Sequence, residues 1–263
     1  MKPKVAFFDF TSCEGCQLTV VDSLQTHLEL LDAVEIVQFR EAMTEKGEDY
    51  QIAFIEGSCV RQSDAERLAH IRQQAKIVVA LGACAHIAGV NAIRNRRDLR
   101  EVKGAVYGEA NGKENGKADD VPHVRPDLLD VFSEAKPIGA IIHVDAVLPG
   151  CPIDREEFVR ATRQLLQGRQ PQIPDYPLCV ECKLKENVCL FHRGQTCLGP
   201  VVRAGCGAIC PSYGEGCEGC RGLISNPNTD SMRSVLEAAG RTVDELLPGY
   251  TMFGTYELMN RGK

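Results

Sequence analysis

Cysteines are concentrated in one stretch of this chain. Eight of its thirteen cysteines lie between Cys179 and Cys220, in a segment that is rich in glycine and poor in long apolar runs. A free cysteine behaves as a small hydrophobic residue and is normally scattered through a core, so this density predicts a shared role. Thiolates bind iron–sulfur cubes and tetrahedral zinc in sets of four, and eight cysteines make two such sets.

Composition and charge limit the class of protein. The 263 residues have a net charge of −6, with 44% hydrophobic and 25% charged residues, as is usual for a globular chain. The acidic excess argues against nucleic acid as a partner. The chain begins without a secretory pattern and has no apolar run of membrane-spanning length, so we expect a cytoplasmic protein without a membrane span. In a cytoplasmic protein, an odd number of cysteines indicates metal binding or catalysis rather than disulfides.

The first part of the chain alternates strand-like and helix-like patterns. Leucines and valines at helical spacing over 18–31 predict one helix, Ser63 is expected to cap a second, and a third runs from an Asp154 cap to Gly168. Such alternation predicts an α/β fold with a doubly wound parallel sheet. Short apolar runs that we interpret as strands occupy residues 4–10, 34–39, 51–55, 76–81 and 138–147.

Local composition suggests where the domains divide. The polar, Gly- and Asn-rich residues 108–125 read as a surface insertion, and three prolines within 169–178 read as a stiff linker. A further helix is expected around 231–239. We therefore divide the chain into residues 1–168, 169–178, 179–228 and 229–263, the last comprising a C-terminal helix and tail.

Four more cysteines follow predicted strands at their carboxyl ends. In an open parallel sheet these ends face one crevice, so we expect four thiols from three loops to converge. The alternative is that two of them are ordinary buried thiols and the C-x-x-C pair acts alone, as a thioredoxin-like dithiol. The four residues are Cys13, Cys16, Cys84 and Cys151.

Spacing divides the other eight cysteines into two sets, although interleaved sets remain open. Zinc is the alternative metal, because paired C-x-x-C motifs also describe zinc sites. Cys-Pro steps at Cys210 and Cys151, and the density of glycine around the ligands, favour iron–sulfur clusters. The first set is Cys179, Cys182, Cys189 and Cys197, and the second is Cys206, Cys210, Cys217 and Cys220.

Taken together, these motifs resemble the small subunit of NiFe-hydrogenases. The match is carried by Cys13-Glu14-Gly15-Cys16, Gly82-Ala83-Cys84, Pro149-Gly150-Cys151-Pro152 and the ordered cysteines from 179 to 220. Within that family the chain is most similar to the cytoplasmic methyl-viologen-reducing (F420-non-reducing) hydrogenases and to the delta subunit of sulfhydrogenases. The resemblance covers nearly the whole chain.

The resemblance implies a flavodoxin-like domain and three 4Fe-4S clusters in an electron-transfer subunit. The NiFe site would belong to a separate large subunit, because this chain lacks the nickel-binding motifs, and electrons would pass to a further flavin or iron–sulfur subunit during reversible H2 oxidation. No catalytic residue is then expected here. The implied ligands are Cys13, Cys16, Cys84 and Cys151 (proximal), Cys206, Cys210, Cys217 and Cys220 (medial), and Cys179, Cys182, Cys189 and Cys197 (distal).

The chain departs from periplasmic family members at two ligand positions. Cys179 stands where they carry a histidine, and Cys210 completes four medial thiols, which implies 4Fe-4S rather than 3Fe-4S. It also shows no twin-arginine leader and no C-terminal anchor. One alternative is the 20-kDa subunit of respiratory complex I, which carries adjacent cysteines where C-E-G-C stands and lacks the Cys-rich extension. The other is a zinc-stapled scaffold without a redox role.

Several polar residues near these motifs have less specific signals. Cys59 is expected to be a buried thiol rather than a ligand, and His192 a surface residue. His86 is a candidate hydrogen-bond donor to a cluster sulfur. Glu14 and Glu56 are expected in the same crevice. They either face the large subunit or are solvated loop carboxylates.

Overall fold

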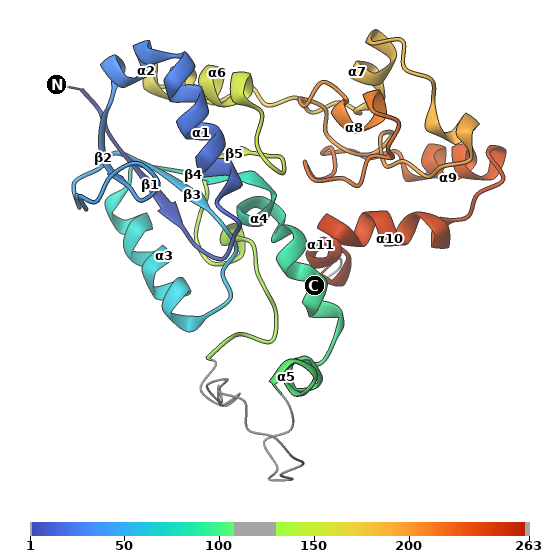
Figure 1. Ribbon diagram of the computed structural model, residues 1–263, viewed down its shortest axis with the longest axis horizontal. Coiled ribbons are helices and arrows are strands. Elements are labelled where there is room, and N and C mark those ends of the chain that lie inside the picture. The colour runs from blue at the N-terminus through green and yellow to red at the C-terminus, as the bar shows by residue number, and fades with distance from the viewer. Residues whose placement is uncertain (1, 108–129, 261–263) are drawn as a thin grey trace, which may run out of the picture.

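The computed structural model describes residues 2–107 and 130–260, and the insertion predicted at 108–125 lies outside them. A five-stranded, fully parallel sheet forms its centre (Figure 1). The strand order β2-β1-β3-β4-β5 is the flavodoxin-like order, so the predicted α/β class is confirmed. The strands are β1 (Lys4–Asp9), β2 (Glu35–Phe39), β3 (Ile52–Glu56), β4 (Ile77–Leu81) and β5 (Ala146–Leu148).

Helices cover both faces of the sheet because successive residues of its strands are apolar and point to opposite faces. Val5 and Phe7 of β1 pack beneath α1 (Gly15–Thr26), α2 (Leu28–Ala33) and α6 (Arg155–Leu166). Ala6 and Phe8 point the other way, toward α3 (Gln62–Gln74). Figure 1 shows α1, α2 and α6 on one side of the strands and α3 on the other. After β4 the chain continues as α4 (Gly82–Ile87), η1 (Gly89–Arg96) and α5 (Leu99–Tyr107).

The last strand is much shorter than the run 138–147 from which it was predicted. Ile138 begins a short 3-10 helix, η3 (Ile138–Ala140), and is fully buried there. The side chain of Asp145 accepts a hydrogen bond from the N–H of Val78 (2.7 Å), so pairing with β4 starts only at Ala146. A continuous apolar run predicts burial, and here only its end is extended.

The helix predicted over 18–31 is broken in two at His27. This residue has an extended φ of −123°, and its N–H donates to the carbonyl of Ser23. The chain then turns so that Leu30 enters the core, while Leu18 and Leu28 stay 55% and 62% exposed. The single apolar face expected for this helix is therefore wrong.

The two predicted helix caps have opposite outcomes. Asp154 does cap α6, accepting a hydrogen bond from the N–H of Glu157 (2.8 Å). Ser63 does not cap α3, which begins one residue earlier. The carboxylate of Asp64 instead accepts from the N–H groups of Val60 and Arg61, each at 3.0 Å.

The Cys-rich segment has a small apolar core of its own. Leu178, Leu198 and Val202 pack there against Leu236 of α9 (Thr229–Ala238). Its own helices are short and are connected by irregular loops. They are α7 (Cys179–Leu184), η4 (Leu190–Arg193) and α8 (Ile209–Ser212).

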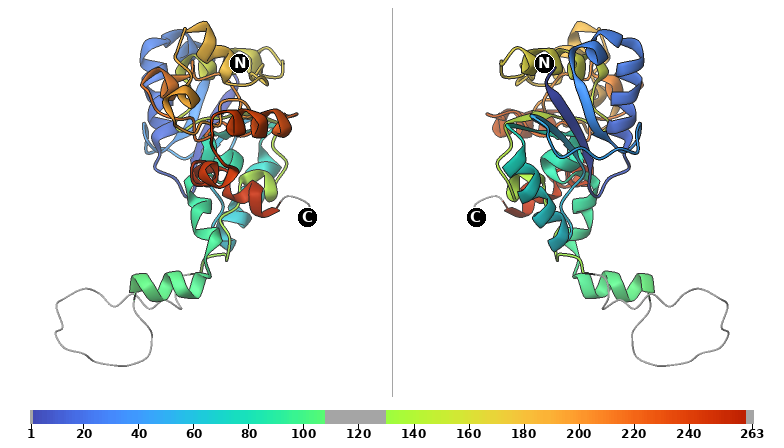
Figure 2. Two further views of the ribbon diagram at one scale, coloured as in Figure 1. Left: turned by 90° about the vertical axis from the view of Figure 1, so that its right-hand side faces the viewer. Right: turned by 90° about the vertical axis from the view of Figure 1, so that its left-hand side faces the viewer.

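Two helices stand where a C-terminal tail was expected. They are α10 (Val243–Phe253) and α11 (Thr255–Asn260), and both pack against η1 of the sheet domain, as Figures 1 and 2 show. Thr242 and Glu245 form a capping box at the start of α10, which was a readable signal in the sequence. Among the described residues, no helix is both long and apolar enough to cross a membrane.

Candidate metal centres

Strand register brings the cysteine-bearing segments to one edge of the sheet. Asp9 pairs with Glu56, Glu56 with Leu81, and Leu81 with Leu148. Asp9, Glu56 and Leu148 are the last residues of their strands, as is Leu81, so the segments that follow leave from the same edge. Of the four cysteines that follow the strands, Cys13 lies in a loop, Cys151 lies in a turn, Cys16 lies in the first turn of α1 and Cys84 lies in α4.

The four thiols at this edge form one group. Cys84 interacts electrostatically with Cys13 and Cys151, and Cys16 interacts with Cys84 and Cys151. Burial raises the pKa of the Cys84 thiol to about 12, and the neighbouring sulfurs add to the effect. The structure thus brings the four residues together, as the sequence predicts.

Glycines let the backbone approach these sulfurs closely. Gly82 has a φ of +82°, and a Cβ atom there would lie only 2.4 Å from Sγ of Cys16. A Cβ on Gly15 would lie 3.3 Å from Sγ of Cys13. The start of α4 is also hydrogen-bonded to the turn after β5, because the N–H of Ala83 donates to the carbonyl of Gly150 (2.7 Å).

Glu56 has a structural role at this edge. Its carboxylate is 2% exposed and accepts hydrogen bonds from the N–H groups of Cys16 (3.2 Å) and Gln17 (2.8 Å), at the first turn of α1. Burial raises its pKa. The prediction of a solvated or partner-facing carboxylate is therefore wrong for Glu56. Glu14 is partly exposed and lies 3.4 Å from Nη1 of Arg40.

A second group of thiols lies around α7. Burial raises the pKa of the Cys179 thiol to about 11, and the three neighbouring sulfurs add to the effect. A small cavity of about 30 Å³ lies among them, and Gly199 lines it as well. A Cβ on Gly199 would lie 3.2 Å from Sγ of Cys179. The group comprises Cys179, Cys182, Cys189 and Cys197.

A third group lies between the other two. Its thiols line a cavity of about 390 Å³, which Cys151 of the first group also reaches. Burial raises the pKa of the Cys220 thiol to about 12, although the backbone N–H of Cys151 acts in the opposite direction. The group comprises Cys206, Cys210, Cys217 and Cys220, and Cys217 also interacts with Cys197 of the second group.

Within residues 2–107 and 130–260, no three His, Cys, Asp or Glu side chains could together bind one metal ion. A tetrahedral zinc draws its thiolates to about 2.3 Å from the metal. A 4Fe-4S cube keeps them apart, because the cluster fills the space between them. The number of cysteines in each group suits either kind of centre.

The remaining sequence candidates lie outside these groups. Cys59 is fully buried, and its Sγ atom is 3.7 Å from the carbonyl oxygen of Arg61. His192 is exposed on η4. The ring of His86 lies against Gly222, and burial, followed by two nearby arginines, lowers its pKa to about 4.

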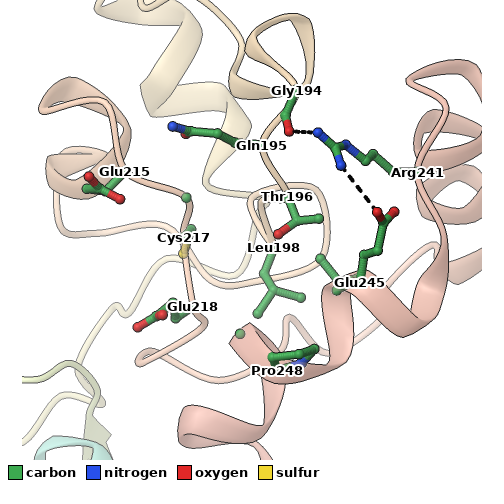
Figure 3. A pocket seen from close by; sticks show the side chains of 13 residues that line it. Gly194, Gln195, Thr196, Leu198, Glu215, Cys217, Glu218, Arg241, Glu245 and Pro248 are labelled. Carbon is green, nitrogen blue, oxygen red and sulfur yellow. Dashed lines mark hydrogen bonds and ion pairs between the residues drawn. The ribbon is translucent and has the colours of Figure 1, made fainter.

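A cavity of about 470 Å³ lies beside Cys217, between the Cys-rich loops and α10 (Figure 3). Arg241 crosses its rim, donating hydrogen bonds to the carbonyl of Gly194 and to Glu245 (3.2 Å). Glu215 and Glu218 lie on the opposite side in Figure 3. Through its two contacts, Arg241 joins the loop after η4 to the first turn of α10.

Sequence reasoning missed three charged residues that join the groups: Glu157, Glu181 and Arg221. Glu157 lies on the buried stripe of α6, at four-residue spacing with Ala161 and Leu165. A carboxylate on an otherwise apolar helix face could have been identified from the sequence as a buried charge. Glu181, inside C-V-E-C, accepts hydrogen bonds from the N–H groups of Gly205 (2.8 Å) and Ala208 (3.2 Å). Nothing in the pattern around Arg221 predicts its contacts.

Comparison with known proteins agrees with this geometry. The family model described as NADH ubiquinone oxidoreductase, 20 Kd subunit, matches residues 13–165. Sulfhydrogenase 2 subunit delta of Pyrococcus furiosus is 37% identical over 89% of this chain and 92% of its own length. A vhu subunit of the F420-non-reducing hydrogenase of Methanococcus voltae is 29% identical over 98% of this chain and 96% of its own length.

A solved structure supports the same relationship. A chain of an NAD⁺-reducing [NiFe]-hydrogenase in the H2-reduced state superposes with a TM-score of 0.56 and 28% identity. The match covers 66% of this chain and 96% of that one. The two hydrogenase relatives also extend through the Cys-rich segment, which lies beyond the family model.

Proposed function

The chain belongs to the family described as the NADH ubiquinone oxidoreductase 20 Kd subunit and, within it, to the electron-transfer subunits of hydrogenases; from this premise we propose that it is the small subunit of a NiFe-hydrogenase. It would bind three 4Fe-4S clusters and relay electrons between the NiFe site of a large subunit and a further flavin or iron–sulfur subunit. The division of the chain after residues 168, 178 and 228 is part of this proposal.

One observation carries the proposal: the three thiol groups form a series in which neighbouring groups touch. The backbone N–H of Cys151, in the first group, faces the thiol of Cys220 in the third. Cys217 of the third group donates its N–H to Sγ of Cys197 in the second (3.3 Å). The order is therefore first, third, second, which corresponds to proximal, medial and distal.

The protein's own groups are suited to thiolate ligands. The N–H groups of Gly199 (3.4 Å) and Cys217 both donate to Sγ of Cys197, and such bonds disperse the negative charge of a thiolate. When bound, the clusters would supply one-electron carriers. Burial raises the pKa of most of these thiols, so iron must displace protons on binding.

A respiratory role is less well supported than a hydrogenase role. The family model alone is compatible with the 20 Kd subunit of complex I, but it ends at residue 165, before all eight cysteines of the Cys-rich segment. The hydrogenase relatives match that segment too. The large subunit is expected at the edge that exposes Cys13 and Cys151, and the electron acceptor near α7.

The test is to purify the chain anaerobically with the subunits that accompany it and to follow its clusters by electron paramagnetic resonance. We expect the clusters to become reduced under H2 only when a nickel-containing partner is present, and to reoxidise when an electron acceptor is added. A complex that contains no nickel, with clusters that NADH reduces and H2 does not, would contradict the hydrogenase assignment.

A further inference from the structure

A buried ion pair joins the sheet domain to the Cys-rich segment. Nη2 of Arg221 lies 2.7 Å and 2.9 Å from the two carboxylate oxygens of Glu157, and both side chains are 2% exposed. Glu157 belongs to α6, whereas Arg221 directly follows Cys220. Burying such a pair costs desolvation energy and by itself is weak evidence for a role in stability. Its role is better judged from what it joins.

The other donors of the guanidinium bind two cysteine-bearing loops. Nη1 donates to the carbonyl of Pro149 (2.8 Å), two residues before Cys151. Nε donates to the carbonyl of Ala204 (2.6 Å), two residues before Cys206. One side chain therefore contacts the loop of a proposed proximal ligand and the loop of a proposed medial ligand, and it is adjacent in sequence to another medial ligand.

The backbone around the guanidinium is shaped to admit it. Gly205 has a φ of +115°, and a Cβ atom there would lie 2.2 Å from Nη2 of Arg221 and 2.8 Å from Oε1 of Glu157. Only glycine leaves room for the ion pair at this position. The loop that carries Cys206 is thus folded against the guanidinium.

A planar guanidinium suits this position better than a lysine. Its five N–H donors lie in a fixed plane and can bind a carboxylate and two carbonyls at once, whereas an ammonium group is a compact point charge. The paired carboxylate also balances the positive charge in a low-dielectric region next to two thiol groups.

We propose that Arg221 is a positioning residue that fixes the medial ligand set against the proximal one, with Glu157 as its charge-balancing partner. The inference rests on the proposed function, since it concerns the clusters that these ligands would bind. Neutralising Glu157 leaves the positive charge of Arg221 without its partner, and neutralising Arg221 leaves the negative charge of Glu157. The two substitutions must therefore shift the reduction potentials of the nearby clusters in opposite directions.

The test uses the anaerobically purified complex and potentiometric titration followed by electron paramagnetic resonance. Arg221→Lys retains the charge and loses the planar donors, so we expect a weaker magnetic interaction between the proximal and medial clusters. Glu157→Gln retains the contacts of Arg221 with both loops and should shift the proximal and medial potentials upward, with the distal potential unchanged. Arg221→Gln should shift the same two potentials downward.

Arg155→Gln is the matched control, because Arg155 lies on the same helix and pairs with Asp22 at the surface (2.6 Å). It should leave the spectra and all three potentials unchanged. If the Arg221 variants fail to assemble, Glu157→Gln still decides: unshifted proximal and medial potentials, or an equal shift at all three clusters, overturn the inference. A parent complex without iron–sulfur signals would instead overturn the proposed function.

Discussion

The backbone N–H of Cys217 donates a hydrogen bond to Sγ of Cys197 over 3.3 Å, which makes a direct contact between the second and third thiol groups. The same sulfur accepts from the N–H of Gly199 (3.4 Å). Burial raises the pKa of the Cys197 thiol, and these two N–H groups partly offset the effect. Cys197 is therefore the sulfur at which the proposed medial and distal sites meet.

Replacing Cys197 tests whether the second group binds a cluster of its own. Cys197→Ala removes one of four thiols and both N–H to sulfur bonds, so we expect the loss of about four of roughly twelve iron atoms per chain. Iron analysis of the purified complex gives the answer. Cys59→Ala, at a buried cysteine outside the three groups, should retain the full content. Unchanged iron in Cys197→Ala would contradict the distal assignment.

Gly82 tests the close approach of the backbone to the first group. Gly82→Ala would place a Cβ atom 2.4 Å from Sγ of Cys16 and would require a left-handed conformation, which costs about 1–2 kcal/mol for a residue with a side chain. We expect displacement of Cys16 and loss of the proximal signal by electron paramagnetic resonance.

Gly104→Ala, on α5, is the control for this substitution, because nothing lies within 4 Å of its Cβ position. It should retain all clusters and stabilise the helix by about 0.5–1 kcal/mol. A proximal signal in Gly82→Ala equal to that in Gly104→Ala would show that the glycine is not required there.

The sequence predicts the position of the cysteines better than the course of the chain between them. Strand ends are readable because Gly82 and Gly150 interrupt apolar runs, and a parallel sheet aligns those ends whatever the exact strand lengths. The break at His27 and the shortness of β5 could not be predicted from the sequence. Both depend on tertiary contacts, such as the hydrogen bond from Val78 to Asp145, that no local pattern encodes.

The contacts between the thiol groups were also beyond prediction. Arg221 and Glu181 act through backbone carbonyl and N–H groups of loops that are distant in sequence, and such partners carry no side-chain signature. The C-terminal helices differ in this respect. The capping box at Thr242 and Glu245 is a local signal, so the start of α10 could have been predicted where a tail was expected.

Glu181 is expected to stabilise the Cys-rich segment. Glu181→Ala leaves the N–H groups of Gly205 and Ala208 without their acceptor, and each orphaned, partly buried donor costs roughly 1–3 kcal/mol. We expect a lower thermal midpoint, together with weaker magnetic coupling between the medial and distal clusters. Glu237→Ala, at an exposed position of α9, should change neither property. Equal midpoints for the two variants would remove Glu181 from this role.

Cluster assembly should depend on pH in a defined direction. Burial raises the pKa of the thiols of Cys84 to about 12 and of Cys179 to about 11, so protons compete with iron for these ligands. An ordinary thiol has a pKa of about 8.5. Reconstitution with iron and sulfide should therefore be more complete at about pH 8.5 than at about pH 6.5, where more of the thiols are protonated. Visible absorbance measures the yield. More complete assembly at the lower pH would contradict the assigned direction.

Iron and acid-labile sulfide per chain, measured on anaerobically purified protein, test the central claim most directly. Three cubes predict a brown protein with about twelve iron atoms and about as many sulfides. A colourless protein with about two zinc ions would contradict the claim outright, and about four iron atoms would restrict it to the single proximal site.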